Sequence, residues 1–376
     1  MGCLICLIYS CQQRNPKYYN QDTLVDFEQI KPKYARGFEI YKKKDISVIK
    51  IKNPWQKAED IEFNYALISS NDNKDRMDEE YVVINLPIQT IVCLSTTHIA
   101  YIDALNELNS IKGISGTSYV NNEFLANNIK AGEVQEVGYE QNINYETIIN
   151  LNPDIIFAYS IGAENIGYLN KFKEIGIPVF YIAEYLEQDP LGKSEWIKVV
   201  AEFFNKTQEA DSIFNIIENE YLNIKTIISE IEYKPNVLTG LPWKGTWFIT
   251  GGKSHLANLI HDAGGQYLWR DMNIYRSEPL SLEAIFQRGV CAECWINCSD
   301  ANSIQDIIAV DERIKALPII KKGNIYNNNA RINANGGNDY WETGVMNPHI
   351  VLKDLLKIFH PEIDLEHELH YYKKLN

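Results

Sequence analysis

Apolar residues recur every three or four positions along residues 206–232, and this period predicts one long amphipathic helix. The apolar positions are Ala210, Ile213, Ile217, Tyr221, Ile224, Ile228 and Ile231. The stretch contains no glycine and no proline, and Pro235 follows shortly after it. At about 1.5 Å per residue, a helix of this length would span roughly 40 Å. We therefore predict a rigid helix that joins two lobes.

Short apolar runs alternate with helical segments from residue 89 onward, whereas residues 37–86 contain short β-type runs separated by turns. The alternation predicts parallel βαβ units, and the earlier segment predicts a small antiparallel sheet. A further amphipathic helix is expected over residues 192–204, directly before the long one. We therefore predict an α/β fold. It has two Rossmann-like lobes with mostly parallel sheets, one long joining helix, and a small antiparallel β addition at the N-terminus.

One helix–strand unit occurs twice, once on each side of the long helix. Asn144 and Ser281 each precede a short helical segment with a glutamate in its first turn, Glu146 or Glu283. An apolar strand follows about ten residues later in both copies. The repeat indicates two lobes of similar architecture. A glutamate in a first helical turn can also serve only the helix dipole, which is worth about 0.3–1 kcal/mol.

Composition places the chain among globular proteins of about two domains. It has 376 residues, of which 45% are hydrophobic and 23% charged. No apolar run approaches the roughly 18 residues of a membrane span. The formal net charge of −14 argues against nucleic acid as a partner, since phosphates attract lysine and arginine. Seven cysteines without disulfide-like spacing provide no disulfide framework.

The first eleven residues, MGCLICLIYSC, resemble a bacterial lipoprotein signal, with an aliphatic residue three positions before Cys11 and a serine directly before it. Cys11 would carry the lipid, and the polar segment after it would form a flexible tether. The basic segment that usually opens such a signal is absent, so a chance apolar N-terminus is the alternative. The predicted organisation is a signal at 1–11, a tether at 12–35, an N-terminal lobe at 36–205, the linking helix at 206–232 and a C-terminal lobe at 233–376.

Polar and aromatic side chains collect in the segments that follow the predicted strands. Ligands of open α/β sheets bind at the carboxyl ends of strands, so these segments should line one cleft. Aromatic rings offer large rigid contact areas, and an arginine offers a planar fork for carboxylates. For any single aromatic residue, packing in the core is the alternative. The candidate ligand-binding residues are Thr97, His98, Tyr119, Tyr159, Tyr185, Trp243, Trp247, Arg331 and Trp341, with Ser95, Thr96, Glu184 and Asn329 beside them.

Several motifs run through the chain from about Gly37 onward. They are IVCLS with DAL, IKGI, NPDII and GIPV in the first half, and LPWKGTWF, GGKSHLANLIHDAGG, EPLSLEAIF and NDYWETGVMNPHIVLKDLLKIFHPE in the second. These motifs resemble those of the substrate-binding lipoproteins of bacterial ABC importers for ferric siderophores, haem and cobalamin, in a branch of the Bacteroidetes type. The resemblance implies two lobes joined by one long helix. It also implies that one glutamate of each lobe docks onto arginines of the permease dimer, and the matching residues are Glu146 and Glu283.

The resemblance further implies a binding protein without catalytic residues, a cofactor or a resident metal. Such a protein would capture a metal chelate or corrinoid in the cleft between its lobes and deliver it to an ABC permease dimer with its ATPase. We expect a monomer in the periplasm or cell envelope, attached to a membrane through its lipid. An enzyme on a related chelatase-like two-lobe fold, acting on a tetrapyrrole, is the alternative, and it would need an acid–base or metal pair in the cleft. A surface scaffold that binds no small molecule is the third possibility.

Three motifs suggest other sites. The segment 251–254, GGKS, resembles the end of a phosphate-binding loop. Trp247 stands where that loop has its first glycine, so we do not predict a nucleotide site. A second motif, the cysteines Cys291, Cys294 and Cys298, has spacing typical of a metal site but lies in a segment that we predict to be a buried strand, where cysteine packs as a small hydrophobe. The third consists of the helix-opening histidines His98 and His255, which face the predicted cleft and are candidates for binding the iron of a chelate.

Overall fold

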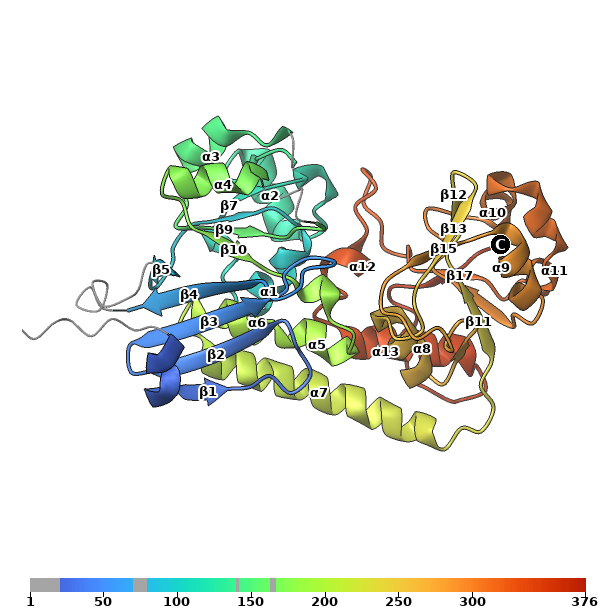
Figure 1. Cartoon of the computed structure of the whole chain (residues 1–376). Coiled ribbons are helices and arrows are strands. Elements are labelled where there is room, and N and C mark those ends of the chain that lie inside the picture. Colours follow the sequence, from blue (N-terminus) through green and yellow to red (C-terminus); the bar gives the residue numbers. More distant parts are fainter. Residues whose placement is uncertain (1–20, 70–79, 140–141, 163–166) are drawn as a thin grey trace, which may run out of the picture.

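The computed structural model describes residues 21–69, 80–139, 142–162 and 167–376. These residues form two α/β lobes side by side, with a long helix running beneath both of them (Figure 1). The predicted lipoprotein signal and Cys11 lie outside the described residues. Among the described helices, none is both long and apolar enough to cross a membrane.

A five-stranded sheet forms the end of the molecule beside the N-terminal lobe. Its strands are β1 (Glu28–Ile30), β2 (Phe38–Lys43), β3 (Ile46–Lys52), β4 (Glu62–Ile68) and β5 (Tyr81–Asn85), in that order. The pairs from β1 to β4 are antiparallel, as predicted. Strand β5 instead pairs parallel to β4, which corrects the prediction of a wholly antiparallel sheet.

Residues 21–35 belong to this sheet and its surroundings instead of forming the second part of a flexible tether. A 3₁₀ helix, η1 (Gln21–Asp26), precedes β1, and Leu24 and Phe27 are buried in a small core on the sheet. The backbone N–H groups of residues 33–35 donate to the buried Glu195 carboxylate over 2.8–2.9 Å. Apolar burial and a buried carboxylate with three donors hold this segment in place.

The N-terminal lobe contains a parallel sheet in the order β10-β9-β6-β7-β8. Its strands are β6 (Ile91–Cys93), β7 (Ile111–Ile114), β8 (Gln135–Glu136), β9 (Ile155–Ala158) and β10 (Val179–Tyr181). The intervening helices are α1 (Thr97–Ala104), α2 (Glu123–Ala131), α3 (Tyr145–Leu151) and α4 (Gly167–Glu174). Strands β6, β9 and β10 are entirely buried, as expected for a sheet whose two faces are both covered.

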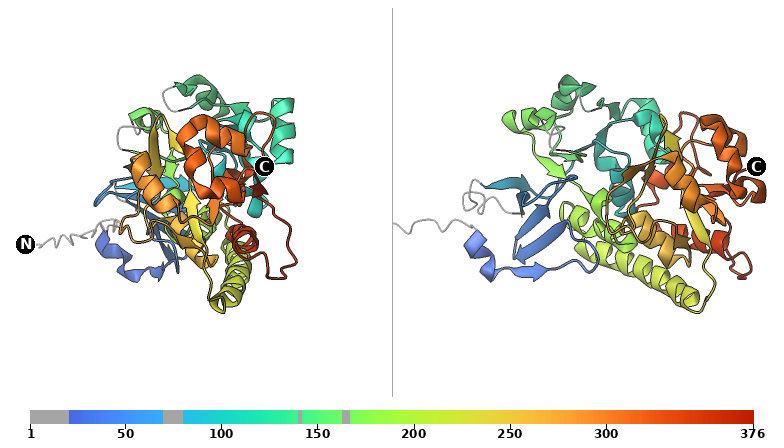
Figure 2. Two further views of the ribbon diagram at one scale, coloured as in Figure 1. Left: turned by 90° about the vertical axis from the view of Figure 1, so that its right-hand side faces the viewer. Right: turned by 45° about the vertical axis from the view of Figure 1, so that its right-hand side comes forward.

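The long helix α7 (Thr207–Ser229) has 23 residues and follows the predicted period. Its buried positions include Ala210, Ile217, Tyr221 and Ile228, which form one stripe along the helix. Figures 1 and 2 show α7 running along one edge of the molecule under both lobes. The expected single helix before it is divided into α5 (Pro190–Glu195) and α6 (Ile197–Glu202), which meet at the buried Trp196.

The C-terminal lobe contains a parallel sheet in the order β14-β11-β16 and a small antiparallel sheet in the order β12-β13-β15. The strands are β11 (Asn236–Thr239), β12 (Pro242–Trp243), β13 (Thr246–Ile249), β14 (Gln266–Tyr267), β15 (Glu278–Leu280) and β16 (Cys294–Ile296), followed by the antiparallel pair β17 (Tyr326–Asn327) and β18 (Lys373–Lys374). The helices are α8 (His255–Asp262), α9 (Leu282–Gly289), α10 (Ile304–Val310), α11 (Pro318–Lys322), α12 (Asp339–Glu342) and α13 (Pro348–Phe359). The predicted fold class, with two lobes and mostly parallel sheets, is confirmed.

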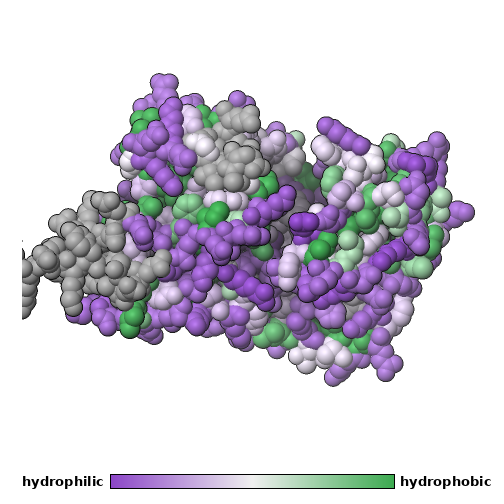
Figure 3. Space-filling model, in the orientation of Figure 1, coloured by the Kyte–Doolittle hydropathy of each residue, from purple (hydrophilic) through white to green (hydrophobic). Residues whose placement is uncertain are grey.

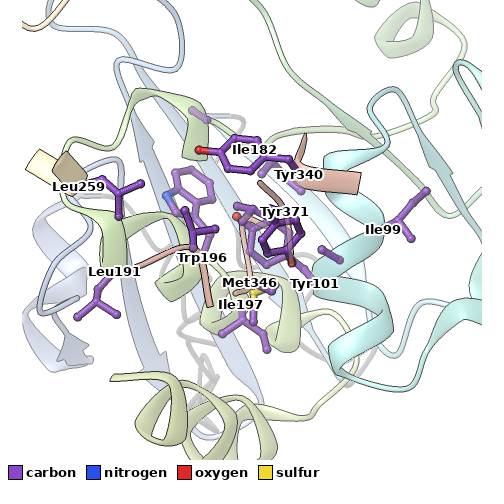
Figure 4. Close-up of a cluster of buried hydrophobic side chains, with 14 of the residues drawn as sticks. Ile99, Tyr101, Ile182, Leu191, Trp196, Ile197, Leu259, Tyr340, Met346 and Tyr371 are labelled. Carbon is purple, nitrogen blue, oxygen red and sulfur yellow. The ribbon is translucent and has the colours of Figure 1, made fainter. Parts of the chain in front are cut away.

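Buried side chains of both halves of the chain form one continuous core that extends through both lobes. Figure 4 shows part of it, where Tyr101 and Trp196 of the first half lie near Tyr340 and Tyr371 of the second. The Asp354 carboxylate, on α13, is fully buried and accepts hydrogen bonds from the backbone N–H groups of residues 370–372. The C-terminal segment is thereby tied to the interlobe core.

Candidate ligand-binding cavity between the lobes

A cavity of about 930 Å³ lies between the two lobes. The first half of the chain contributes residues 55–59, the 3₁₀ helix η7 (Glu184–Leu186) and α5, and the second half contributes α8, residues 273–277, α12 and the start of α13. Figure 3 shows the surface hollowed between the lobes. The volume lies within the range of roughly 300–1,000 Å³ that is typical of small-molecule sites.

Four aromatic side chains line the cavity from both sides. They are Trp55 and Tyr185 from the first half, and Tyr275 and Trp341 from the second. Trp55 is buried, whereas Tyr275 and Trp341 are 51% and 59% exposed. The Tyr185 hydroxyl donates to the carbonyl of Ser160 over 2.5 Å, which fixes the orientation of its ring. Such a wall can contact the rings or apolar chains of an organic ligand.

The titratable side chains that line the same cavity include Glu184, Lys193 and His255. Burial raises the pKa of the Glu184 carboxyl to about 7, and the Lys193 charge opposes this only in part. Burial also lowers the pKa of the Lys193 ammonium. Burial, together with the Lys193 charge, lowers the pKa of His255 far below its ordinary value, so this imidazole is neutral at pH 7. Burial thus disfavours the charged form of each group.

The segment 333–342 of the C-terminal lobe crosses to the N-terminal lobe beside the cavity. The Glu342 carboxylate accepts from the backbone N–H groups of Asn121 and Asn122 over 2.8 and 2.9 Å. The Thr97 hydroxyl donates to the carbonyl of Trp341 over 3.0 Å, and the Asn333 amide donates to two carbonyls of residues 118–120 over 3.1 Å. This bridge is a second connection between the lobes, in addition to α7.

Of the sequence-predicted ligand residues, the structure brings Thr97, Tyr185 and Trp341 together in the cavity lining. Thr97 opens α1 after strand β6, Tyr185 follows strand β10, and Trp341 lies on α12. Glu184, named beside them, also lines the cavity. These residues follow strand ends or lie on the bridging segment, which is the arrangement expected for an open α/β sheet.

Two predicted residues lie in the core and do not line the cavity. His98 is 1% exposed, and its ring lies edge-on to Phe157 at 6.3 Å between centroids. Burial lowers the pKa of His98 to about 3. Trp247 is also 1% exposed, stacks on Trp295 at 5.6 Å, and donates to the Thr239 carbonyl over 3.0 Å. Trp247 therefore packs in the core, which is the alternative for any single aromatic residue.

Four others lie outside the cavity lining. Trp243 is 63% exposed at the end of β12, with the Lys244 ammonium 4.4 Å from its ring centre. The Arg331 guanidinium pairs with the Asp339 carboxylate over 2.5 Å beside the bridge. Tyr119 is 46% exposed, and Tyr159 is partly buried. The neighbouring Asn329, also named beside the candidates, is buried, and its amide donates to the Ala301 carbonyl over 3.1 Å.

The paired glutamates occupy equivalent positions in the two lobes. Glu146 is the second residue of α3 and Glu283 the second residue of α9, and both are exposed. Asn144 and Ser281 cap these helices, each accepting from a backbone N–H three residues later over 3.0 and 3.3 Å. An exposed ion pair of 3.9 Å joins Glu283 to Arg313. Both carboxylates are therefore accessible to a partner.

Sequence reasoning missed Trp55, Lys193 and Tyr275 as cavity residues. Trp55 lies in a turn between two strands, and Lys193 is the one basic residue of the short helix α5. No local sequence pattern marks these three residues, because segments that are distant in the chain form the cavity. His255, proposed as a candidate iron ligand, does line the cavity.

The cysteine motif is divided between surface and interior. Cys291 is exposed, whereas Cys294 and Cys298 are buried, and only Cys294 lies in strand β16. Burial raises the pKa of both buried thiols. In the described part of the chain, no three His, Cys, Asp or Glu side chains are grouped so that they could hold a metal ion.

Comparison with known proteins agrees with this architecture. The sequence profile of the periplasmic binding protein family matches residues 91–331, more than half of the chain. An uncharacterized lipoprotein of Methanocaldococcus jannaschii is 28% identical over 312 residues, which cover 81% of this chain and 72% of that protein.

Solved structures of low sequence identity share the fold. A possible iron-binding periplasmic solute-binding protein of Staphylococcus epidermidis superposes with a TM-score of 0.56 at 18% identity, covering 72% of this chain and 98% of the other. A periplasmic heme-binding protein of Pseudomonas aeruginosa superposes with a TM-score of 0.55 at 15% identity, covering 75% of this chain and 96% of the other.

Proposed function

Because this chain belongs to the periplasmic binding protein family, we propose that it captures an iron chelate, either a siderophore or haem, or cobalamin, and delivers it to an ABC permease. Members of this family bind small ligands and work with the permease and ATPase components of ABC transporters.

The observation that carries the proposal is the cavity between the lobes. Its volume of about 930 Å³ is sufficient for a ring-bearing chelate, and both lobes contribute to its lining. The aromatic residues Trp55, Tyr185, Tyr275 and Trp341 suit the rings or apolar arms of such a ligand. The names of two proteins of the same fold, one possibly iron-binding and one heme-binding, support this ligand class.

For delivery, we propose that Glu146 and Glu283 dock onto arginines of the two permease subunits. The carboxylates are exposed at matching helix starts, one in each lobe, so that two charge-assisted contacts can set the register of a wide interface. Neither residue lines the cavity, so ligand capture does not depend on them.

We further propose that the protein is a monomer attached to a membrane through Cys11. The archaeal relative is a lipoprotein, which supports this mode of attachment. A lipid on Cys11 would hold the folded lobes near a permease at the membrane surface.

Two experiments test the proposed function. Mass spectrometry of ligand that co-purifies with the protein from its native host should detect an iron chelate, haem or a corrinoid. Addition of the identified ligand should quench tryptophan fluorescence, and Trp341→Ala should reduce that quenching while Trp243→Ala, at an exposed position outside the cavity, should not. A purified protein that carries none of these ligands and binds none of them when they are added would refute the proposal.

One observation favours the alternative of a chelatase-like enzyme. Glu184 and His255 both line the cavity, and burial shifts the pKa of each. An enzyme would use such a pair to remove protons from a tetrapyrrole during metal insertion. Incubation with protoporphyrin and ferrous or zinc ions, followed by its absorption spectrum, tests this possibility. The alternative requires turnover that Glu184→Gln abolishes.

A further inference from the structure

A lysine without a protein partner lines the interlobe cavity. Lys193, on α5, is half-buried and lines the cavity, yet its ammonium makes no hydrogen bond or ion pair with the described residues. The half-buried Lys198 on the next helix instead pairs with Glu195 at 3.6 Å and Asp211 at 3.3 Å. Because burial disfavours the charged ammonium, an anion in the cavity would gain a favourable contact with Lys193.

The nearby carboxylates do not supply it. Glu187 is occupied by other donors, since it accepts from the backbone N–H groups of Arg36 and Gly37 and from the Trp196 indole over 2.9–3.0 Å. Glu184 affects Lys193 only through its field and forms no ion pair with it. A bound ligand can therefore provide the contact that Lys193 lacks.

Glu184 has an unsatisfied atom at the same place. Its side chain is 6% exposed and lines the cavity, and its Oε2 atom has no hydrogen-bond partner among the described residues. A buried polar atom of this kind is expected to be satisfied by a water or a ligand. Both unpartnered groups thus lie in the lining of a single cavity.

We propose that Lys193 and Glu184 form an anion subsite that binds an uncoordinated carboxylate of the captured chelate. Lys193 donates to one carboxylate oxygen, and Glu184, protonated, donates from Oε2 to the other. The proton comes from the solvent, because two neighbouring carboxylates share one proton more readily than both remain ionised. This inference rests on the proposed function and narrows the ligand to chelates with a free carboxylate, such as haem or a carboxylate siderophore.

The groups that face this subsite come from several elements. In the first half of the chain, the charges of Lys193 and Glu187 act on Glu184, and Glu184 in turn acts on the Tyr101 and Tyr185 hydroxyls. From the second half, neutral His255 lies near Lys193. The remaining charged side chains of the lining are at exposed positions: Lys57, Glu59 and Arg276. Since His255 is already neutral at pH 7, we assign the proton uptake to Glu184.

The test compares chelates that differ in their carboxylates. The probes are ferric citrate, haemin, haemin dimethyl ester, an uncharged ferric trihydroxamate and cyanocobalamin, measured by calorimetric titration. We expect ferric citrate or haemin to bind and the three probes without free carboxylates to bind at least about tenfold more weakly. If only the three probes without free carboxylates bind, the anion subsite is wrong while the proposed function stands. If none of the five binds, the proposed function itself fails.

Variants of the two residues test their separate roles with the carboxylate probe that binds. Lys193→Met should weaken binding by about 10- to 100-fold, and Lys193→Arg, which keeps the charge, should restore part of it. The matched control Lys198→Met, on α6 and outside the cavity, should leave binding unchanged. Thermal unfolding shows whether each variant is folded. Unchanged affinity in a folded Lys193→Met would overturn the proposal.

The pH dependence of binding to Glu184→Gln distinguishes a titrating group from a purely structural one. The amide keeps a donor but cannot titrate, so binding to this variant should be independent of pH between 6 and 8. Wild-type affinity should fall as pH rises through that range, because the bound state holds the extra proton. Titrations in two buffers of different ionisation enthalpy should show proton uptake by wild type and none by Glu184→Gln. Equal uptake by both proteins would contradict the assignment.

Discussion

Removal of the Glu342 carboxylate should destabilise the protein in a way that depends on pH. This side chain is 1% exposed and accepts from the backbone N–H groups of Asn121 and Asn122, at 2.8 and 2.9 Å, across the gap between the lobes. Glu342→Ala leaves both donors without a partner, and each such donor costs about 1–3 kcal/mol. The loss of hydrogen bonds alone therefore predicts a decrease in unfolding free energy of about 2–6 kcal/mol.

Ionisation of the same carboxyl lowers the unfolding free energy of the wild-type protein as pH rises. Burial raises the pKa of Glu342 from 4.5 to about 7, so the folded state binds a proton that the unfolded state has released. The resulting stabilisation is fully present below about pH 4.5 and is lost as pH rises through about 7. It amounts to about 3 kcal/mol, at roughly 1.4 kcal/mol per pKa unit. Glu342→Ala lacks this contribution, so the variant should be much less stable than wild type at pH 5 and closer to it at pH 8.

Urea unfolding at pH 5 and pH 8 measures both free energies. Glu136→Ala is the control, because this carboxylate also accepts from backbone N–H groups, those of Gly116, Thr117 and Gly138, but only within the N-terminal lobe. Burial would raise the pKa of Glu136, yet these donors together lower it, so its effect should not change between pH 5 and 8. An equal loss of stability in Glu342→Ala at both pH values, or no loss at pH 5, would refute the reasoning.

Three further predictions concern docking, the C-terminal segment and attachment. The double variant Glu146→Arg and Glu283→Arg should keep its ligand affinity and melting temperature but lose uptake in a strain that depends on this protein, because like charges would meet at both contacts; normal uptake would exclude the docking role. Asp354→Ala should lower the unfolding free energy by about 3–9 kcal/mol, at about 1–3 kcal/mol for each of the three backbone N–H groups that lose their fully buried acceptor, and Asp354→Asn should cost less; equal stability of the two variants in urea would contradict this. Cys11→Ala should move the protein from the detergent phase to the aqueous phase, and identical partition of both forms would exclude a lipid at this position.

The sequence by itself was sufficient for features that depend on neighbours in the chain. The period of apolar residues in α7, the caps Asn144 and Ser281, and the apolar runs of β9 and β10 are local signals, and the structure has an element at each. Such signals arise because a helix or strand repeats its geometry every few residues. The α/β class and the two lobes followed from them, and so did cavity residues that directly follow strands, such as Tyr185.

Only the tertiary structure decided which side chains meet across the lobes. His98 and Trp247 stand in segments that resemble cleft loops, but their rings pack against Phe157 and Trp295, which no local pattern indicates. Lys193 acquires its importance from a cavity that residues more than sixty positions away help to form. The Glu342 bridge likewise joins positions 220 residues apart. Contacts of this kind depend on how whole elements pack, because the free energy of burial is shared by many side chains and is not specified by any short stretch of sequence.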